Sequence, residues 1–319
     1  MKIVVLERNS VGTDISIEGI TSLGEAVVYP NTVADEVVER IHDAEIIVAN
    51  KVPLNEGTLK DAPNVKLICE FATGFDNVDI AYCRSRGIKV ANIVGYSTDS
   101  VAQHTFALCL YVLEKLKRYD DYVKSGTYAA QSRFSNFDLP FFELAGKTWG
   151  IVGMGNIGRK VAQIAAAFGC RVIFYSVTGK SSCTDYERVD FDTLLAESDV
   201  LSLHCPLSDL TRHLINKEAL KKMKSSAVLV NVARGSVICD EDLYEALVEG
   251  EIAGAGLDVT STEPMKESNP LSRIQDSSRL IITPHMAWAS VEARIRCVNE
   301  TAENIKAFLS GENRNIVNL

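Results

Sequence analysis

The stretch that decides the fold is Thr148-Trp149-Gly150-Ile151-Val152-Gly153-Met154-Gly155-Asn156-Ile157-Gly158. It places the pattern GxGxxG directly after an apolar run and directly before a segment with helical spacing. In such a strand–turn–helix the first glycine makes the tight turn, the second lets the backbone approach a pyrophosphate, and the third lets helix and strand pack closely. The free N–H groups at the helix N-terminus favour an anion. The context therefore predicts a dinucleotide-binding turn, formed by Gly153, Gly155, Asn156, Ile157 and Gly158.

The loop after the next predicted strand bears on the choice between NAD(H) and NADP(H). A dinucleotide fingerprint usually has an acidic residue about 20 positions on, which holds the adenosine ribose diol. Here the strand Arg171–Tyr175 is followed by Ser176, and Lys180 lies in the loop. The absence of a carboxylate permits a 2′-phosphate, although no arginine follows the strand. We therefore expect NAD or NADP as the cofactor, with NADP slightly favoured, and Ser176 and Lys180 among its contacts.

Outward from the glycine turn, apolar runs alternate with segments of helical spacing in both directions. Four runs precede the turn, at Lys2–Leu6, Glu45–Ala49, Leu67–Phe71 and Lys89–Ile93. The strands expected after it are Arg171–Tyr175, Val200–His204, Ala227–Val232, Ala255–Val259 and Leu280–Thr283. This alternation predicts the α/β class, with parallel sheets covered by helices.

A long helix is predicted from about Thr98 to Lys124. Its first half is apolar nearly all round, which is typical of a helix buried in a domain junction or a subunit interface. An irregular, aromatic segment follows from Ser125 to Glu143, and a final helix is expected from about Ser290 to Leu309. We place the domain boundary near residues 97–100, with the tail after about residue 287 able to return to the first domain.

Composition narrows the class of protein. The chain has 319 residues, is 46% hydrophobic and 24% charged, and carries a net charge of −9, so it is not a disordered or low-complexity chain. An acidic surface does not suit nucleic acid or an anionic membrane. The longest apolar run, Phe106–Leu113, is far shorter than the roughly 20 residues of a membrane span. The first residues, MKIVVLER, have no secretory pattern, so we expect a cytoplasmic protein.

The cysteines and histidines give no sign of a metal site. The eight cysteines form no CxxC pair, and the five histidines are scattered along the chain. Most of the cysteines lie in apolar strands or helices, which is typical of buried, reduced thiols. We therefore predict no metal.

Three motifs with polar residues follow strands of the second series. They are Asn231–Gly235 (NVARG), Ala255–Pro264 (AGLDVTSTEP) and Thr283–Trp288 (TPHMAW). Open α/β sheets bind ligands at the carboxyl ends of their strands. A cation directly after a buried strand is costly unless it faces a pocket or a partner. Arg234, Asp258, Glu263 and His285 are therefore candidate site residues.

In this order GMGNIG, NVARG, AGLDVTSTEP and TPHMAW resemble the D-isomer-specific 2-hydroxyacid dehydrogenase family. The first half agrees, because residues 72–79 (ATGFDNVD) and 95–105 (GYSTDSVAQHT) resemble the family's substrate loop and linking helix. The second of these is most similar to the glycerate dehydrogenase (hydroxypyruvate reductase) branch. The resemblance covers essentially the whole chain. It implies two doubly wound domains, a flavodoxin-like substrate domain of residues 1–98 plus 287–319 and a Rossmann-type NAD(P)-binding domain of residues 99–286.

The resemblance also implies roles for individual residues. Arg234 matches the arginine that holds the substrate carboxylate and carbonyl, His285 the general acid/base, and Glu263 the carboxylate paired with it. Thr73 and Gly74 match the loop whose N–H groups receive the substrate carboxylate, together with Arg234 and His285. Beyond the glycine turn, Ser176 and Lys180, the cofactor contacts implied are Cys205, Pro206, Val232, Ala233, Arg234, Asp258 and His285.

The activity implied is hydride transfer between NAD(P)H and C2 of a small 2-oxo acid, giving the D-2-hydroxy acid. Hydroxypyruvate or glyoxylate is the expected substrate, and the family's mode of assembly implies a homodimer built on the linking helix and the adjacent segment. Two alternatives stay open. One is a dinucleotide-sensing binding protein of the corepressor type. The other is a formate dehydrogenase-like enzyme, whose family has a Gln–His pair, so Glu263 argues against it.

Overall fold

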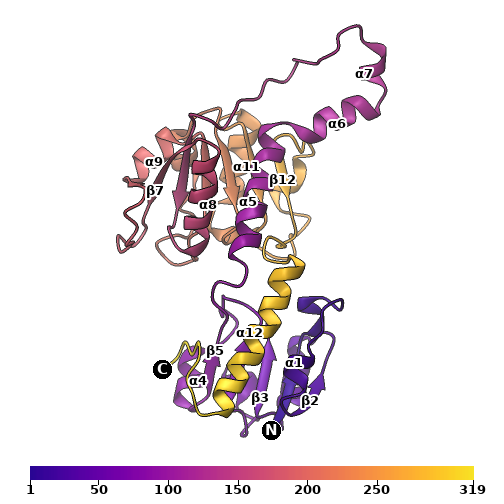
Figure 1. Cartoon of the computed structure of the whole chain (residues 1–319), viewed down its shortest axis with the longest axis vertical. Coiled ribbons are helices and arrows are strands. Elements are labelled where there is room, and N and C mark those ends of the chain that lie inside the picture. Colours follow the sequence, from indigo (N-terminus) through magenta and orange to yellow (C-terminus); the bar gives the residue numbers. More distant parts are fainter. The chain divides into compact units, whose positions relative to one another are not determined.

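The computed structural model describes residues 1–319, and the chain folds into two compact units. Unit 1 consists of Met1–Ser97 and Trp288–Leu319, and unit 2 of Thr98–Ala287. Each unit holds one sheet of parallel strands with helices packed on it (Figure 1). The predicted α/β class with two parallel sheets is confirmed.

The sheet of unit 1 has five strands in the order β2-β1-β3-β4-β5, which is the flavodoxin-like order. The strands are β1 (Lys2–Val5), β2 (Glu25–Val28), β3 (Ile46–Ala49), β4 (Leu67–Glu70) and β5 (Lys89–Ala91). The central strands β3 and β4 are buried on both faces, as parallel strands between two helix layers must be. β2 is the exposed edge strand, and its partial exposure explains why hydrophobicity alone did not predict it.

Two apolar clusters cover the faces of this sheet. One includes alternate residues of β1, Ile3 and Val5, and the long helix α12 (Val291–Leu309). The other includes Val4 and the helices α2 (Val37–Ile41) and α3 (Glu56–Leu59). The remaining helices of the unit are α1 (Glu18–Thr21) and α4 (Ile80–Ser85).

The end of the chain belongs to unit 1. The final helix α12 begins after Ser290, whose hydroxyl accepts the N–H of Ala293 at 3.2 Å. The segment that follows it returns to β5, where Asn318 accepts the Val90 N–H and donates to the Ile88 carbonyl.

The sheet of unit 2 has seven strands in the order β12-β11-β10-β9-β6-β7-β8, all parallel. They are β6 (Thr148–Val152), β7 (Arg171–Tyr175), β8 (Glu187–Arg188), β9 (Val200–Leu203), β10 (Val228–Asn231), β11 (Gly254–Leu257) and β12 (Leu280–Ile282). The chain reverses direction across the sheet at β6, because β7 and β8 lie on one side of it and β9 on the other. Such a switch point leaves a crevice at the carboxyl ends of the strands, where doubly wound folds bind ligands.

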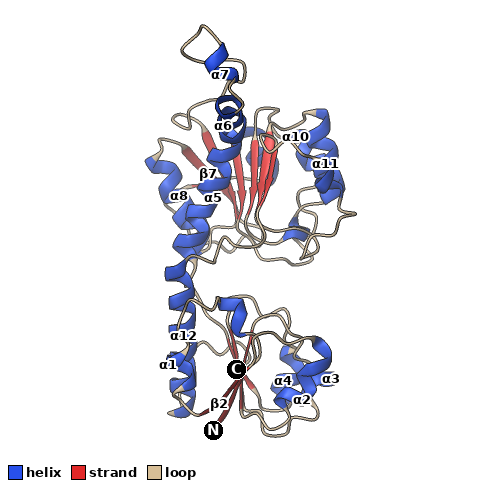
Figure 2. Cartoon of the chain, turned by 90° about the vertical axis from the view of Figure 1, so that its right-hand side faces the viewer, coloured by secondary structure: helices blue, strands red, loops and turns tan.

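Helices cover both faces of this sheet (Figure 2). On one face α5 (Thr98–Leu113) packs beside α8 (Asn156–Ala167), around buried Trp149 and Phe174. The other face carries α9 (Phe191–Glu197), α10 (Lys217–Lys222) and α11 (Asp240–Glu249). The strand β8 is a short, exposed edge strand that the sequence did not indicate.

The predicted single helix from Thr98 to Lys124 is wrong in one respect. It is interrupted, because α5 ends at Leu113 and α6 (Leu116–Lys124) begins after Lys115, which has a left-handed backbone with φ +56°. The Lys115 ammonium donates to the Ser278 carbonyl at 3.0 Å, and this contact across the fold fixes the break. The helices α6 and α7 (Thr127–Ala130) and the loop after them project from the body of unit 2 (Figures 1 and 2).

Candidate active site and dinucleotide site

The glycine turn between β6 and α8 has the geometry that a pyrophosphate needs. Gly153 has φ +94°, and a Cβ there would lie 2.8 Å from the His204 carbonyl oxygen. At Gly158 a Cβ would lie 2.2 Å from the Gly153 oxygen, so the helix packs directly on the turn. At Gly155, by contrast, a Cβ would meet no atom within 4 Å. The second glycine therefore leaves an open approach to the N-terminus of α8, where its first N–H groups lie.

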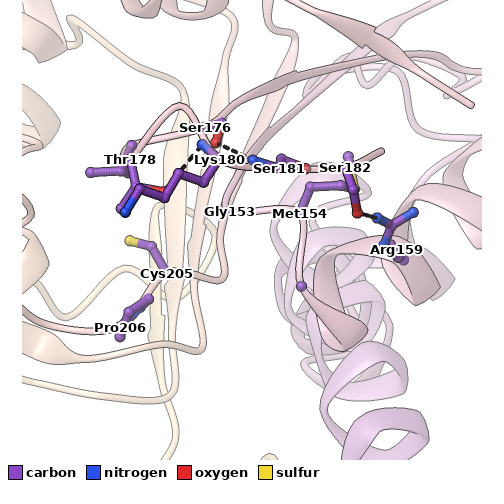
Figure 3. Close-up of a pocket in the computed structure, with 12 residues that line it drawn as sticks. Gly153, Met154, Arg159, Ser176, Thr178, Lys180, Ser181, Ser182, Cys205 and Pro206 are labelled. Carbon is purple, nitrogen blue, oxygen red and sulfur yellow. Dashed lines mark hydrogen bonds between the residues drawn. The ribbon is translucent and has the colours of Figure 1, made fainter. Parts of the chain in front are cut away.

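A cavity of about 310 Å³ lies over this turn (Figure 3). Its lining includes six of the residues that the sequence indicated, namely Gly153, Gly155, Ser176, Lys180, Cys205 and Pro206. It also includes Arg159, Thr178, Ser181 and Ser182, which the sequence motifs did not indicate. Arg159 directly follows the glycine motif, and that position in the first turn of α8 could have identified it.

The loop from Ser176 to Ser182 presents hydroxyls and cations to this cavity. The Arg159 guanidinium lies 3.5 Å from the Ser182 hydroxyl, and the Ser181 N–H donates to Ser176 Oγ at 3.3 Å. From β8, Arg188 donates to the Gly179 carbonyl at 2.9 Å and so fixes the tip of the loop. No carboxylate lines the cavity. The nearest acidic group to Arg159 is Asp185, with 3.9 Å between the charged atoms.

Glu263 and His285 form a close pair. His285 Nδ1 lies 2.6 Å from Glu263 Oε2, and the two side chains are 27% and 33% exposed, respectively. The second Glu263 oxygen accepts the Thr260 N–H at 3.3 Å, so the carboxylate is itself held in place. A carboxylate bound at Nδ1 fixes the proton there and orients the ring, which leaves Nε2 as the nitrogen that exchanges protons with a substrate.

Arg234 comes from the turn after β10. Asn231 shapes this turn, because its side chain donates to the Arg234 carbonyl and accepts the Ala233 N–H, both at 3.0 Å. A Cβ at Gly235 would lie 1.9 Å from the Thr260 carbonyl oxygen. The turn thus packs directly on the backbone of the segment that leads to Glu263. Val232 is half-buried and Ala233 is buried in the same turn.

Asp258 is almost fully buried at the end of β11, and its carboxylate is used within the chain. It accepts the Thr283 hydroxyl at 2.6 Å and the N–H groups of Met286 and Ala287 at 2.9 and 2.8 Å. Its backbone oxygen accepts the His285 N–H at 2.8 Å. Asp258 therefore organises the turn that carries His285, a function that the sequence did not reveal.

Arg234, Glu263 and His285 lie at one edge of one sheet. The strands β10, β11 and β12 are neighbours, and each of the three residues follows one of them. Thr73 and Gly74 lie in unit 1, in the loop after β4, where Asn92 donates to the Thr73 carbonyl at 2.8 Å. The Thr73 hydroxyl is used internally, because it donates to the Ile93 carbonyl at 2.6 Å.

Two residues beside the glycine turn are neutral. Burial raises the pKa of the Cys205 thiol to about 11, so it is a lining group and no nucleophile near pH 7. Burial lowers the pKa of His204 to about 3, and its Nε2 lies 3.0 Å from the Ser202 hydroxyl.

No three His, Cys, Asp or Glu side chains are grouped as metal ligands would be. None of the helices is both long and apolar enough to cross a membrane.

The comparisons with known proteins agree with this geometry. The family model described as "D-isomer specific 2-hydroxyacid dehydrogenase, NAD binding domain" matches residues 106–287. A hydroxypyruvate reductase of Blautia hydrogenotrophica is 39% identical over the full length of both chains. A glycerate dehydrogenase of Methylorubrum extorquens is also 39% identical, over 99% of this chain and 98% of its own. Among solved structures, an acyclic imino acid reductase in complex with NADPH and D-Arg is similar with a TM-score of 0.89 and 29% identity, over 99% of this chain and all of the other.

The sheet order, the glycine turn and the polar residues at the strand ends define an oxidoreductase that binds NAD(P). The chain belongs to the D-isomer-specific 2-hydroxyacid dehydrogenase family.

Proposed function

We propose that this protein reduces a small 2-oxo acid, hydroxypyruvate or glyoxylate, to the D-2-hydroxy acid with NAD(P)H. The observation that carries the proposal is the 2.6 Å Glu263–His285 pair, held on the same sheet edge as Arg234 and in the same unit as the dinucleotide turn. The relatives named hydroxypyruvate reductase and glycerate dehydrogenase support this substrate class.

The chain's own residues handle the proton and the charges of the substrate. When bound, the reduced nicotinamide supplies the hydride that adds to C2 of the 2-oxo acid. His285 donates a proton from Nε2 to the alkoxide oxygen that develops, while Glu263 stabilises the imidazolium form that can donate. Arg234 binds the carboxylate and the carbonyl oxygen, because its planar guanidinium can donate to both. We also propose that the N–H groups of Thr73 and Gly74 bind the substrate carboxylate.

For the cofactor we propose contacts that begin at the glycine turn, with Asn156 and Ile157 offering N–H groups to the pyrophosphate. Cys205 and Pro206 line the cavity beside the turn, and Val232 and Ala233 lie in the Arg234 turn. Asp258 contributes by holding the His285 turn. In this proposal unit 2 is the dinucleotide-binding domain and unit 1 is the substrate-binding domain.

We further propose a preference for NADPH over NADH. Ser176 occupies the position at which NAD-binding proteins usually have a carboxylate, which would repel a 2′-phosphate. The only charged residues that line the cavity are Arg159 and Lys180. Hydroxyls of Thr178, Ser181 and Ser182 line the same cavity. A dianionic phosphate is suited by two cations and several hydroxyl donors.

The eight cysteines are free thiols in the structure, which fits a reducing compartment, and we propose the cytoplasm as the location.

A substrate matrix tests this proposal. NADH and NADPH are each offered with hydroxypyruvate, glyoxylate, pyruvate and phenylpyruvate, and nicotinamide oxidation is followed. The proposal predicts the highest kcat/KM with hydroxypyruvate or glyoxylate and a D-configured product. A protein that binds dinucleotide but turns over none of these acids would contradict it, and would favour the dinucleotide-sensing alternative.

A further inference from the structure

The helix α5 lies on the strand β11 in a fixed register. A Cβ on Gly254 would lie 2.6 Å from the Val112 side chain, and a Cβ on Gly256 would lie 2.8 Å from Leu108 Cβ. Val112 and Leu108 are four residues apart on the helix, and the two glycines are two residues apart on the strand. Four helical residues rise about 6 Å and two strand residues about 6.6 Å, so the spacing matches.

One step further along this register, four residues before Leu108 and two after Gly256, stand His104 and Asp258. His104 Nε2 lies 2.9 Å from Thr283 Oγ1 and 3.5 Å from Asp258 Oδ1. The close packing that the two glycines permit thus brings the imidazole to the carboxyl end of β11. A helix held further from the strand by side chains at these positions would not reach it.

The direction of the hydrogen bonds follows from the chemistry of the three groups. The Thr283 hydroxyl lies 2.6 Å from Asp258 Oδ1 and donates to it, because a carboxylate only accepts. The hydroxyl oxygen is then the acceptor for His104 Nε2–H. The result is a chain of donors from His104 through Thr283 to Asp258, and the side chain of His104 is only 20% exposed.

Asp258 in turn determines the conformation of the His285 turn. His285 has φ +52°, a left-handed backbone that residues with a Cβ rarely adopt. The Asp258 carboxylate accepts the N–H groups of the two residues that follow, and its backbone oxygen accepts the His285 N–H. These bonds hold the backbone from which the imidazole reaches Glu263.

We propose that His104 is a positioning residue of the active site, which orients Asp258 through Thr283 and thereby aims His285. The inference rests on the proposed function, since it takes His285 as the proton donor. His104 acts through its neighbours and touches neither substrate nor cofactor. Its role is to keep the donor chain complete, and any side chain that places an N–H at the same point should support it.

Steady-state kinetics separate this role from a general structural one. His104→Leu removes the donor and should lower kcat for the 2-oxo acid by between about tenfold and 100-fold, with a smaller change in KM, because a displaced acid affects the chemical step. His104→Gln places an amide N–H near the position of Nε2 and should restore most of kcat. Thr105→Val is the matched control, since it removes a buried hydroxyl of the same helix that bonds only to the Val101 carbonyl.

The kinetic outcomes decide the question. Wild-type kcat in His104→Leu, or an equal loss in His104→Gln and His104→Leu, would overturn the proposal. Thr283→Val breaks the middle link, so its effect on kcat should not add to that of His104→Leu in the double variant. Full additivity would also contradict a shared chain.

A measurement without turnover keeps this test separate from the proposed function. With five histidines, ¹⁵N-labelled imidazoles can be assigned in the full-length protein. We expect the His104 ring to carry its proton on Nε2, protected from exchange, and to lose that protection in Thr283→Val. A proton on Nδ1, or no change in Thr283→Val, would overturn the proposal even if the enzyme turned over no acid tested. If the ring behaves as expected while the wild-type protein reduces none of the 2-oxo acids tested, the proposed function fails and the hydrogen-bond chain stands.

Discussion

The charged side chains differ in sign between the glycine turn of unit 2 and the strand ends near His285. Around the glycine turn the charged lining groups are the cations Arg159 and Lys180, whereas the strand ends near His285, where we propose the catalytic site, hold the carboxylates of Glu263 and Asp258. The Asp258 carboxylate accepts hydrogen bonds from the backbone and from Thr283, and Glu263 is bonded to His285 and the Thr260 N–H. Both of these carboxylates therefore have partners that offset their desolvation.

The proposed preference for NADPH depends on Ser176 more than on any other side chain. Ser176→Asp places a carboxylate where it can accept from the ribose diol and repel a 2′-phosphate. We expect the ratio of kcat/KM for NADPH to that for NADH to fall by at least about tenfold, which corresponds to about 1.4 kcal/mol. Ser176→Ala is the control for loss of the hydroxyl alone. An unchanged ratio in Ser176→Asp would mean that the ribose is recognised elsewhere.

Glu70 predicts a pH dependence of stability. It is fully buried at the end of β4, its Oε2 has no partner, and Asn77 donates weakly to Oε1 at 3.3 Å. Burial raises the pKa of this carboxyl from 4.5 to about 8, so the folded chain keeps a proton that the unfolded chain has lost. Between these values the free energy of unfolding decreases as pH rises, by up to about 1.4 kcal/mol per pH unit.

Glu70→Gln removes this linkage and keeps the shape of the side chain. The variant should match the wild type near pH 4.5 and become progressively more stable than it toward pH 8. Denaturant unfolding at several pH values between these limits measures the difference. A constant difference in stability across this range would show that Glu70 does not titrate in the folded chain.

At the scale of elements, the register of α5 on β11 connects the interior of unit 2 to the strand ends that carry the proposed catalytic residues. The stretch Gly254–Leu257 has glycine at alternate positions, and each glycine faces a different turn of the helix. Because α5 lies this close to β11, the His104 side chain reaches Thr283 and Asp258 at the strand ends. We therefore expect the stability of unit 2 and the position of the His285 turn to depend on the same contact surface.

Gly256→Ala tests this link. A Cβ there would lie 2.8 Å from Leu108 Cβ, so helix and strand must separate, at a cost of about 1–3 kcal/mol. We expect a lower Tm and also a lower kcat, because the separation moves His104 away from Thr283. Gly19→Ala is the control, since a Cβ there would meet only Ala302 Cβ, at 3.8 Å. A lower Tm with an unchanged kcat would contradict the link, because the packing would then not affect the position of His285.

The sequence predicted the helices, strands and turns that depend on residues close together in the chain. The glycine turn, the buried strands β3, β4, β9 and β10, and the helix α12 depend on glycine geometry and continuous apolar runs. The edge strands β2 and β8 were missed because their burial is low, and the helix break at Lys115 because a contact with the Ser278 carbonyl fixes it.

The same distinction applies to the residues of the candidate site. The residues at the strand ends, Arg234, Glu263 and His285, could be proposed from their motifs, and the structure brings Glu263 and His285 together. Arg159, Glu70 and the internal role of Asp258 were not predicted. Their significance comes from neighbours that are distant in sequence, such as Ser182 for Arg159 and Thr283 for Asp258.

At the scale of the whole molecule, the segment that projects from unit 2 exposes large apolar side chains. Phe134 is 88% exposed and Phe137 is 75% exposed, and Phe141, Tyr128 and Val123 are also exposed in this segment. Exposed apolar groups gathered on one extension are typical of a surface that a protein partner covers. We propose that a second copy of the chain covers them, in a homodimer.

Light scattering after size exclusion measures the assembly. The chain has a mass of 34.9 kDa, so the dimer should have a mass of about 70 kDa. The triple variant Phe134→Ser, Phe137→Ser, Phe141→Ser should shift the protein toward the monomer. The control is Phe168→Ser, which changes an exposed phenylalanine outside this segment. A wild-type mass of one chain at micromolar concentration would contradict the proposed dimer.

The measurement that tests the central claim most directly compares the wild type with His285→Asn, with two quantities determined for each. These are the kcat for hydroxypyruvate reduction and the Kd for the reduced dinucleotide, followed by nicotinamide fluorescence. Our account predicts a loss of kcat of at least about 100-fold, because general acid catalysis contributes about that much, with a Kd changed by less than about threefold. A His285→Asn variant that reduces the acid at the wild-type rate would contradict the assignment of His285 as the proton donor, and with it the proposed mechanism.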